Sequence, residues 1–403
     1  MKKGWISEVL KEATHFKSGK TVSKTIEKEF GEILYTKVGD MNLEGNEEFI
    51  TTSTRYVDKK DINENQIIPL GAVIFPKRGG AIATNKKRRI IKPTIVDLNT
   101  MAVTPSDKLN SDYLYYWFES IDLQELSNGT SIPQINNTSF DNVYISYPQS
   151  LQEQQQIVAI LDEAFEAIDQ AKANIEKNIE NAKELFQSKL NEIFSGSALS
   201  GAEGKGEDWE EKMLGEIGKV SMCKRILKKQ TSPTGDIPFY KIGTFGKKPN
   251  AFIDKEIYKE FKEKYPFPKK GDILISASGT IGRRVIYNGE PAYFQDSNIV
   301  WIDNNEDLVL NEYLYQFYGI CDWNPSKGAT ISRLYNDDLR RIKISFPNTL
   351  EQKKLVKNMV ALNIQTKRIF HHYRKKMENL EELKKSILQK AFSGELTNKE
   401  PVV

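Results

Sequence analysis

Cysteine and histidine are scarce in this chain of 403 residues, which contains two cysteines, Cys223 and Cys321, and three histidines, His15, His371 and His372. Two cysteines are too few for a disulfide framework or a cysteine-rich zinc site. Three histidines leave little material for a metal site or for triad-type acid–base catalysis. These absences argue against disulfide-rich, zinc-binding and histidine-dependent classes of protein.

Long hydrophobic runs are also missing. No segment approaches the roughly 18 apolar residues of a membrane-spanning helix, and the basic N-terminus lacks the apolar stretch of a signal peptide. Hydrophobic residues make up 39% and charged residues 28%, which predicts a globular chain with a heavily charged surface. We expect a cytoplasmic protein of about two to four domains with no membrane partner.

Motifs of nucleotide hydrolysis, DNA methylation and DNA cleavage are incomplete. Gly19-Lys20-Thr21 ends like a phosphate-binding loop, but the place of the first glycine is taken by Thr14. The Pro-Pro pair of DNA methyltransferases does not occur. Glu-x-Lys triplets, one half of a metal-dependent nuclease motif, do occur, but the Pro-Asp pair that should precede them does not. We therefore expect no catalytic site, no metal site and no cofactor bound by this chain.

Basic residues are clustered, although the net charge is only +3. Residues 65–96 include no acidic residue and seven Lys or Arg, and residues 217–235 include no acidic residue and five. Such patches are typical of surfaces that bind phosphates, because released counterions favour the association. Either patch alone is equally compatible with an ordinary solvated surface.

The chain is an internal duplication. Residues 5–39 align without a gap with residues 209–243, and residues 153–196 align without a gap with residues 351–394, sharing 13 identities over 44 positions. A spacing near 200 residues is too long for a solenoid. It predicts two copies of a domain that is followed by a helix.

Each copy is expected to start β-rich and to end in a long helix. Runs such as 33–38, 72–76, 143–147 and 272–276 have the β-branched and aromatic residues of strands, and shorter helices are predicted near 111–119 and 311–318. The predicted divisions are 1–149 (first β-rich domain), 150–196 (central helix), 197–208 (linker), 209–348 (second β-rich domain), 349–394 (C-terminal helix) and 395–403 (tail).

Apolar residues of the two long helices recur at four-three spacing, which favours a coiled coil. Capping boxes are expected at Ser150 and Thr349, and Gly196 and Gly394 are placed to end the helices. The predicted apolar seam consists of Ile157, Leu161, Ile168, Ile175, Leu355, Met359, Leu362, Ile369, Tyr373, Leu380 and Ile387.

Two diverged β-rich domains, each followed by a similar long helix, resemble the specificity subunits of type I restriction-modification systems. The resemblance covers nearly the whole chain. Its most specific parts are the helix segments PQSLQEQQQIVAIL through LNEIFSG and PNTLEQKKLVKNMV through LQKAFSGEL, and the loop motifs GTIG and GTSIP support it more weakly.

The resemblance implies an α+β fold with two target-recognition domains in a pseudo-two-fold arrangement, joined by two antiparallel helices that form a coiled-coil spacer. Each domain would read one half of an asymmetric bipartite site in double-stranded DNA. The implied partners are two copies of a methyltransferase subunit, which would extrude an adenine, and motor-nuclease restriction subunits. These partners would bind S-adenosylmethionine, ATP and Mg, leaving this chain without a cofactor.

Candidate DNA-contacting residues follow from the basic patches and from the polar loops that recur in both copies. Base reading requires Arg, Lys, Asn, Gln, Ser or Thr on loops that enter a groove. The candidates for base reading are Lys77, Arg78, Thr130, Gln134, Asn136, Asn137, Ser278, Thr280, Arg283, Arg284, Lys327, Arg333, Tyr335 and Asn336. The candidates for phosphate contacts are Lys86, Lys87, Arg88, Arg89, Lys224, Arg225, Lys228 and Lys229.

Two other functions stay open at this point. One is the specificity subunit of a restriction-methylation enzyme of another type, and the other is a coiled-coil scaffold that recruits proteins without DNA. A sharply salt-dependent affinity for duplex DNA would distinguish a recognition subunit from a scaffold.

Overall fold

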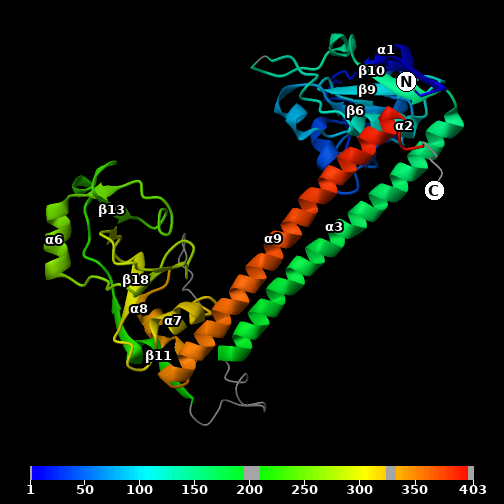
Figure 1. The fold of residues 1–403 in the computed structure, drawn as a ribbon. Helices are drawn as coiled ribbons and strands as arrows, with labels where there is room; N and C mark the ends of the chain where they lie inside the picture. Colours follow the sequence, from blue (N-terminus) through cyan, green and yellow to red (C-terminus); the bar gives the residue numbers. More distant parts are fainter. Residues whose placement is uncertain (1, 130, 195–208, 324–332, 398–403) are drawn as a thin grey trace, which may run out of the picture. The chain divides into compact units, whose positions relative to one another are not determined.

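The chain folds into two compact units. Unit 1 contains Met1–Ile175 and Arg374–Val403, and unit 2 contains Glu176–Tyr373. The computed structural model describes residues 2–129, 131–194, 209–323 and 333–397 (Figure 1). Thr130, Lys327, Gly196 and the predicted linker lie outside the described residues.

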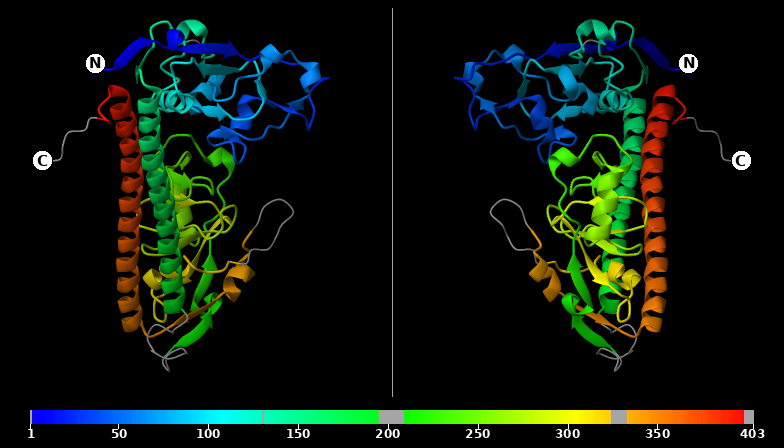
Figure 2. Two further views of the ribbon diagram at one scale, coloured as in Figure 1. Left: turned by 90° about the vertical axis from the view of Figure 1, so that its right-hand side faces the viewer. Right: turned by 90° about the vertical axis from the view of Figure 1, so that its left-hand side faces the viewer.

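Two long helices belong to both units. They are α3 (Leu151–Phe194), with 44 residues, and α9 (Thr349–Ser393), with 45 residues. In unit 1 the start of α3 lies beside the end of α9, and in unit 2 the end of α3 lies beside the start of α9 (Figures 1 and 2). The two helices are therefore antiparallel, and each unit contains one end of each helix.

The described strands of unit 1 form three sheets. They are β1 (Trp5–Val9), β2 (Thr14–Ser18), β3 (Ile33–Thr36), β4 (Phe49–Ile50), β5 (Tyr56–Val57), β6 (Val73–Pro76), β7 (Arg88–Ile90), β8 (Thr94–Val96), β9 (Thr100–Pro105) and β10 (Tyr144–Pro148). The sheet orders are β1-β10, β2-β9-β6-β7-β4 and β5-β3-β8. Only short helices accompany these sheets, chiefly α1 (Leu10–Ala13) and α2 (Ser111–Glu119).

The described strands of unit 2 repeat this topology. They are β11 (Glu210–Met213), β12 (Gly218–Ser221), β13 (Ile237–Tyr240), β14 (Phe252–Ile253), β15 (Ile273–Ser276), β16 (Arg284–Ile286), β17 (Tyr293–Phe294), β18 (Ile299–Asn304) and β19 (Lys343–Phe346). The sheet orders are β11-β19, β12-β18-β15-β16 and β14-β13-β17. The helices are α5 (Leu214–Ile217), α6 (Lys255–Lys264), α7 (Asn311–Phe317) and α8 (Asn336–Arg341).

The β-rich domains of the two units match strand for strand. The parallel pair β3 and β8 of unit 1 corresponds to the parallel pair β13 and β17 of unit 2, and every other pair in the shared order is antiparallel in both. Unit 1 adds the edge strand β4, and unit 2 adds the helix α6. The sequence duplication is thus a duplication of fold.

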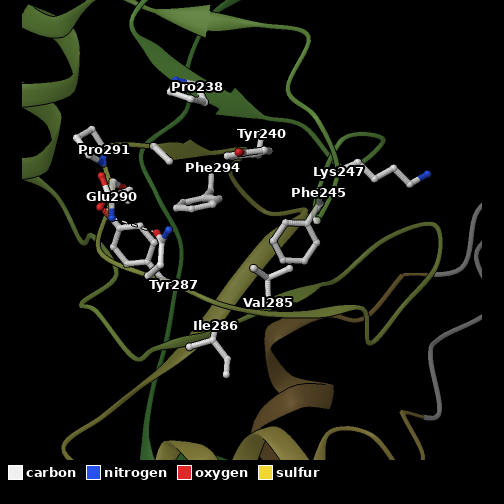
Figure 3. A pocket seen from close by; sticks show the side chains of 13 residues that line it. Pro238, Tyr240, Phe245, Lys247, Val285, Ile286, Tyr287, Glu290, Pro291 and Phe294 are labelled. Atoms are coloured by element: carbon white, nitrogen blue, oxygen red, sulfur yellow. Dashed lines mark hydrogen bonds between the residues drawn. The ribbon is translucent and has the colours of Figure 1, made fainter. Parts of the chain in front are cut away.

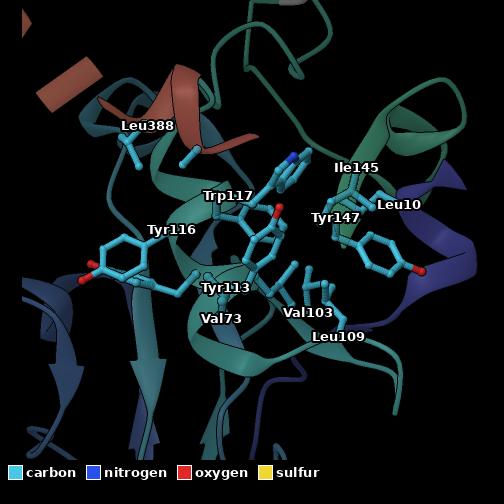
Figure 4. Packing of buried hydrophobic residues seen from close by; sticks show 14 of the residues in the cluster. Leu10, Val73, Val103, Leu109, Tyr113, Tyr116, Trp117, Ile145, Tyr147 and Leu388 are labelled. Atoms are coloured by element: carbon cyan, nitrogen blue, oxygen red, sulfur yellow. The ribbon is translucent and has the colours of Figure 1, made fainter. Parts of the chain in front are cut away.

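One buried cluster of unit 1 lies between its main sheet and α2, and two others involve β3 and its neighbours. All four residues of β6 are buried, as expected for a central strand with no solvent-facing side. Figure 4 shows Tyr113 of α2 close to Val103 of β9, and Trp117 and Val73 of β6 belong to the same cluster. Burial of each such side chain contributes on the order of 1.5–3 kcal/mol to the hydrophobic free energy of folding. Leu388 of α9 belongs to the same cluster, so the end of α9 is packed into this core.

A buried glutamine fixes the start of α3 to the β-rich domain of unit 1. The side chain of Gln154 is fully buried. Its Nε2 donates to the carbonyl oxygens of Lys108 and Pro148, both at 2.9 Å, and its Oε1 accepts from the backbone N–H of Asn110 at 2.7 Å. One amide side chain therefore satisfies three backbone groups.

The start of α9 is held in the same way. Gln352 is also fully buried. Its Nε2 donates to the carbonyl oxygens of Leu308 and Pro347, both at 2.8 Å, and its Oε1 accepts from the backbone N–H of Leu310 at 2.9 Å. The glutamine shared by the two copies of the repeat therefore has the same structural role in both.

The Phe-Ser-Gly ends of the helices also have matching roles. Phe392, near the end of α9, contacts Tyr113 of unit 1, with ring centroids 5.1 Å apart. Phe194, at the end of α3, contacts Tyr313 of unit 2, with ring centroids 4.9 Å apart. Each long helix thus starts at the β-rich domain that precedes it in the chain and ends in the core of the other unit. Gly394 has a φ of +82°, the left-handed conformation that closes a helix.

The predicted helix caps are correct only in part. Ser150 Oγ accepts from the backbone N–H of Glu153 at 3.4 Å, as expected. The box predicted at Thr349 is wrong, because α9 already includes this residue. Asn348 precedes it, and its Oδ1 accepts from the backbone N–H of Glu351 at 3.1 Å.

The predicted seam lies mostly on the inward faces of the helices. Buried residues are Ile157, Leu161, Ile168, Ile175, Leu355 and Met359, and half-buried residues are Leu362, Tyr373, Leu380 and Ile387. The assignment of Ile369 is wrong, since its side chain is 42% exposed, whereas Thr366 is 8% exposed. A helix with 3.6 residues per turn drifts relative to a strict seven-residue repeat, so sequence spacing alone misplaces individual positions.

Candidate nucleic-acid interface

Two loops that are far apart in the sequence are paired in unit 1. The backbone N–H of Ile135 donates to the carbonyl of Lys77 at 2.9 Å, and that of Gly79 donates to the carbonyl of Pro133 at 2.8 Å. These bonds bring together three predicted base readers, Lys77, Arg78 and Gln134. Arg78 is exposed, and its guanidinium offers the paired donors that suit guanine.

Unit 2 pairs the corresponding loops with the same bond. The backbone N–H of Leu334 donates to the carbonyl of Ala277 at 2.9 Å, and these two residues align with Ile135 and Lys77. Ser278 and Arg333 form a bridge at the positions of Arg78 and Gln134. The sequence predicted both loops in each repeat, and the structure brings them together in both.

The other predicted base readers flank these pairs. Asn136 and Asn137 are exposed where a short 3-10 helix begins, and Tyr335 and Asn336 stand at the start of α8. Thr280 is exposed in the loop after β15. Their role as base readers stays a prediction.

Arg283 and Arg284 are more enclosed than their sequence positions suggest. Arg283 Nη1 donates to the carbonyl of Phe245 at 3.0 Å, and the guanidinium of Arg284 lies 4.5 Å from the ring centroid of Tyr315. Both side chains are half-buried. Their contact with DNA also stays a prediction.

The run of four cations in unit 1 does not form a uniform phosphate-binding surface. Lys87 is 1% exposed, and its Nζ donates to Asn85 Oδ1 at 2.9 Å and to the carbonyl of Ile121 at 2.8 Å. Burial lowers the pKa of Lys87 to about 8, because the charged ammonium loses hydration there. The predicted phosphate contact of Lys87 is therefore wrong.

Arg89 is a second correction in this run. It is 7% exposed, its guanidinium lies between the rings of Phe49 and Tyr115, at 4.2 and 4.5 Å from their centroids, and it pairs with Glu48 and Asp112. These contacts hold the side chain inside the domain, so it cannot reach a phosphate.

The remaining cations of the run are partly accessible. Arg88 is half-buried and donates to the backbone carbonyls of Lys87 and Met41 at 2.7 and 3.1 Å. Lys86 is half-exposed and bonds to Asn42. Of the four, Lys86 is thus the one best placed for an outside contact.

The basic patch of unit 2 is on the surface as expected. Lys224, Arg225, Lys228 and Lys229 are all exposed. Arg225 and Lys228 line an open cavity of about 260 Å³, which Lys241 and the segment 295–298 complete. Cations from separate segments therefore share one surface depression, as binding to a phosphate backbone requires.

Sequence reasoning missed the segment between β17 and β18, which contains Asp296, Ser297 and Asn298. Its counterpart between β8 and β9 contains Asp97 and Asn99. The signal was present, because Asp-x-Asn occurs at the same place in both copies. It was overlooked because the intervening residues differ.

A second cavity of unit 2, of about 290 Å³, is lined mainly by aromatic and aliphatic residues (Figure 3). Tyr240 stacks on Phe294, with centroids 5.8 Å apart and planes 16° from parallel. None of the predicted DNA-contacting residues lines this cavity. The candidate interface lies elsewhere, on the paired loops and the basic patch.

The described part of the chain contains neither a metal-binding cluster nor a membrane-spanning helix. No group of three or more His, Cys, Asp and Glu is arranged there to hold a metal ion. Within the same residues, no helix combines the length and the apolar character needed to cross a membrane.

The family model for the type I restriction modification DNA specificity domain matches residues 2–181 and 206–379. Each match covers one copy of the fold and the first part of the long helix that follows it. Since they cover most of the chain, the chain belongs to the family of type I restriction-modification DNA specificity proteins.

Curated relatives carry the same description. A type I restriction enzyme specificity subunit of Haemophilus influenzae is 46% identical over 256 residues, which are 63% of this chain and 64% of that protein. The MjaIX specificity subunit of Methanocaldococcus jannaschii is 26% identical over 376 residues, 86% of this chain and 83% of that protein. The match thus spans slightly less than two thirds of the Haemophilus relative and most of the Methanocaldococcus one.

Solved structures show the same fold. A chain from a study of complex assembly and conformational transition in the type I restriction-modification system has a TM-score of 0.75 at 19% identity, covering 98% of this chain and 99% of that one. The HsdS subunit from Thermoanaerobacter tengcongensis has a TM-score of 0.60 at 19% identity, covering 98% of each. At this identity the similarity concerns the fold alone.

Proposed function

We propose that this chain selects the double-stranded DNA sequence on which a type I restriction-modification enzyme acts, with each recognition domain reading one half of an asymmetric bipartite site. The observation that carries this proposal is the pair of loops closed by equivalent backbone bonds in both units. In unit 1 these loops present Arg78 and Gln134, and in unit 2 they present Ser278 and Arg333. Because base edges are distinguished by donor and acceptor patterns, different side chains on one scaffold would read different half-sites.

The chain would act without a catalytic site of its own. Two copies of a methyltransferase subunit, together with restriction subunits that have motor and nuclease activity, would supply the chemistry. S-adenosylmethionine, ATP and Mg would bind to those partners. In support, the long helices expose apolar side chains such as Ile160, Val360 and Ile364, which are 40%, 41% and 48% exposed. Val360 and Ile364, four residues apart, share one face of α9, and contiguous exposed apolar surface is typical of sites that a partner covers.

The test is to express the chain with its methyltransferase subunit and to map modified bases in the host DNA. One asymmetric bipartite motif that disappears when this chain is omitted would support the proposal. Methylation that is absent, or that persists without this chain, would contradict it and favour a scaffold that does not read DNA. Steeply salt-dependent binding to duplex DNA is expected in parallel.

Substitution of the paired-loop arginines should change specificity more than overall affinity. Arg78→Ala and Arg333→Ala are each expected to reduce discrimination roughly tenfold at base pairs of one half-site, because a bidentate contact is lost. Lys228→Ala, on the exposed basic patch, should weaken binding to all sequences and lower the salt slope by about 1. Competition binding with single-base variants of the motif measures both the loss of discrimination and the overall weakening. Uniform weakening by Arg333→Ala would contradict its role as a reader.

A further inference from the structure

We propose that the loop Asp296–Asn298 is a positioning element that fixes the DNA-reading side chains of unit 2 and thereby determines specificity at one half-site. This inference rests on the proposed function and adds residues that make it possible. The loop joins β17 to β18, and none of its residues belongs to the basic patch or to the paired loops.

Two of its side chains hold candidate DNA-contacting residues from separate segments. Arg225 Nε donates to Asp296 Oδ2 at 2.8 Å. Ser278 Oγ and Asn298 Oδ1 are 2.7 Å apart, with the hydroxyl as donor. Arg225 comes from the segment after β12 and Ser278 from the loop after β15. The loop therefore connects two segments that do not adjoin in the sequence.

The third contact uses the backbone. Arg333 Nη2 donates to the carbonyl of Ser297 at 3.1 Å. Ser297 has a φ of +52°, a left-handed conformation that residues other than glycine adopt infrequently. The backbone N–H of Ala277 donates to the carbonyl of Asn298 at 2.8 Å, which ties the loop to the strand end beside it. The loop is thus itself held in place while it holds the arginine.

The exposed fractions suit a positioning role. The Asp296 side chain is 16% exposed and that of Arg225 is 68% exposed, so a fixed carboxylate orients an accessible guanidinium. The ion pair uses one of the five N–H donors of Arg225, and the other four suffice for a bidentate contact with guanine. Held in this way, Arg225 would read a base, in place of the phosphate contact expected from the sequence. Restricting a long side chain before binding lowers the entropy lost on contact with DNA.

The same element stands in unit 1 with different attachments. Asp97 is 8% exposed and accepts from Asn99 Nδ2 at 3.0 Å and from Thr100 Oγ1 at 2.8 Å. The backbone N–H of Lys77 donates to the carbonyl of Asn99 at 2.8 Å, as Ala277 does to Asn298. The Asp-x-Asn loop is thus common to both domains, but Asp97 bonds within its own segment whereas Asp296 bonds to Arg225.

The experiment uses the full chain in complex with its methyltransferase subunit and compares wild type with Asp296→Asn, Arg225→Gln and the double variant. Each complex is titrated with a duplex that contains its mapped motif and with a scrambled duplex. Asp296→Asn preserves shape and removes the charge that orients Arg225. We expect roughly tenfold weaker binding to the motif and equal or tighter binding to the scrambled duplex.

Two alternatives predict different results. If Asp296 were only a surface charge that repels phosphates, Asp296→Asn would tighten binding to both duplexes equally. If it only stabilised the fold, binding to both would weaken equally. Either outcome overturns the inference. A double variant that is clearly worse than Arg225→Gln would overturn it too, since the aspartate would then act independently of the arginine.

Methylation maps give a second readout. Relaxed positions in the Asp296→Asn map should lie in the half of the motif that Arg333→Ala also alters, and changes in both halves would contradict the inference. Asp303→Asn is the matched control, because Asp303 pairs with Lys269 at 3.1 Å on the surface of the same domain. It should leave the motif unchanged. A wild-type complex without any motif would instead refute the proposed function itself.

Discussion

Gln154→Leu and Gln352→Leu should each lower the free energy of unfolding by about 3 kcal/mol, because each removes three hydrogen bonds to backbone groups, one of them buried and two part-buried. For Gln154 these groups are the N–H of Asn110 and the carbonyls of Lys108 and Pro148. Leucine fills a similar volume, so the loss reflects unsatisfied hydrogen bonds and not a cavity.

Urea denaturation of the full chain, followed by circular dichroism, measures this loss. Gln155→Leu is the matched control, since the neighbouring Gln155 is exposed and its replacement should change the stability by under about 0.5 kcal/mol. Equal stability of Gln154→Leu and Gln155→Leu would contradict the anchoring role. Because the two glutamines lie in different units, a double variant should show nearly additive losses.

Lys87 should make the stability of unit 1 rise with pH. Burial lowers its pKa in the folded chain to about 8 from 10.5, so between these values the unfolded state binds more protons than the folded state. Stability therefore increases as pH rises through this window, and the cost of burying the charge is fully present below pH 8. From pH 7 to pH 9.5 the gain that this lysine contributes is about 2 kcal/mol.

The measurement is the difference in unfolding free energy between wild type and Lys87→Met at pH 7 and pH 9.5. Subtracting the variant cancels the tyrosines and other groups that titrate in the same range. Lys87→Arg is the control, because arginine stays charged at both pH values and should lose the pH-dependent gain as Lys87→Met does. Parallel pH profiles for wild type and Lys87→Met would show that the lysine is not buried as described.

Lys87 also shows why charge clusters are a weak guide to a binding surface. Two of the seven cations in the acid-free segment 65–96 are buried inside the domain. They are Lys87 and Arg89. Their acidic and carbonyl partners come from elsewhere, with Asp112 and Ile121 among them. A sequence window cannot show such partners, because they are distant along the chain.

The long helices show the opposite case, in which local pattern was sufficient. Their predicted starts, 150 and 349, lie within one residue of the observed starts of α3 and α9, and the predicted end at 394 lies one residue beyond the observed end of α9. Helix periodicity, proline upstream and glycine downstream are all short-range signals, so the sequence contains them directly. Ile369 was wrongly placed in the seam. The direction of a side chain depends on the rotation that accumulates along the helix as well as on its spacing from its neighbours.

By itself, the sequence determined the duplication, the alternation of β-rich domain and long helix, and the loops that hold the candidate readers, since all three are written in local patterns that occur twice. Only the tertiary structure decided which of these residues meet. It paired Arg78 with Gln134 and Ser278 with Arg333. It also buried Lys87 and made Asp296–Asn298 the common attachment of three cationic or polar side chains. Burial and pairing depend on contacts between segments far apart in the chain, and no short stretch of sequence contains that information.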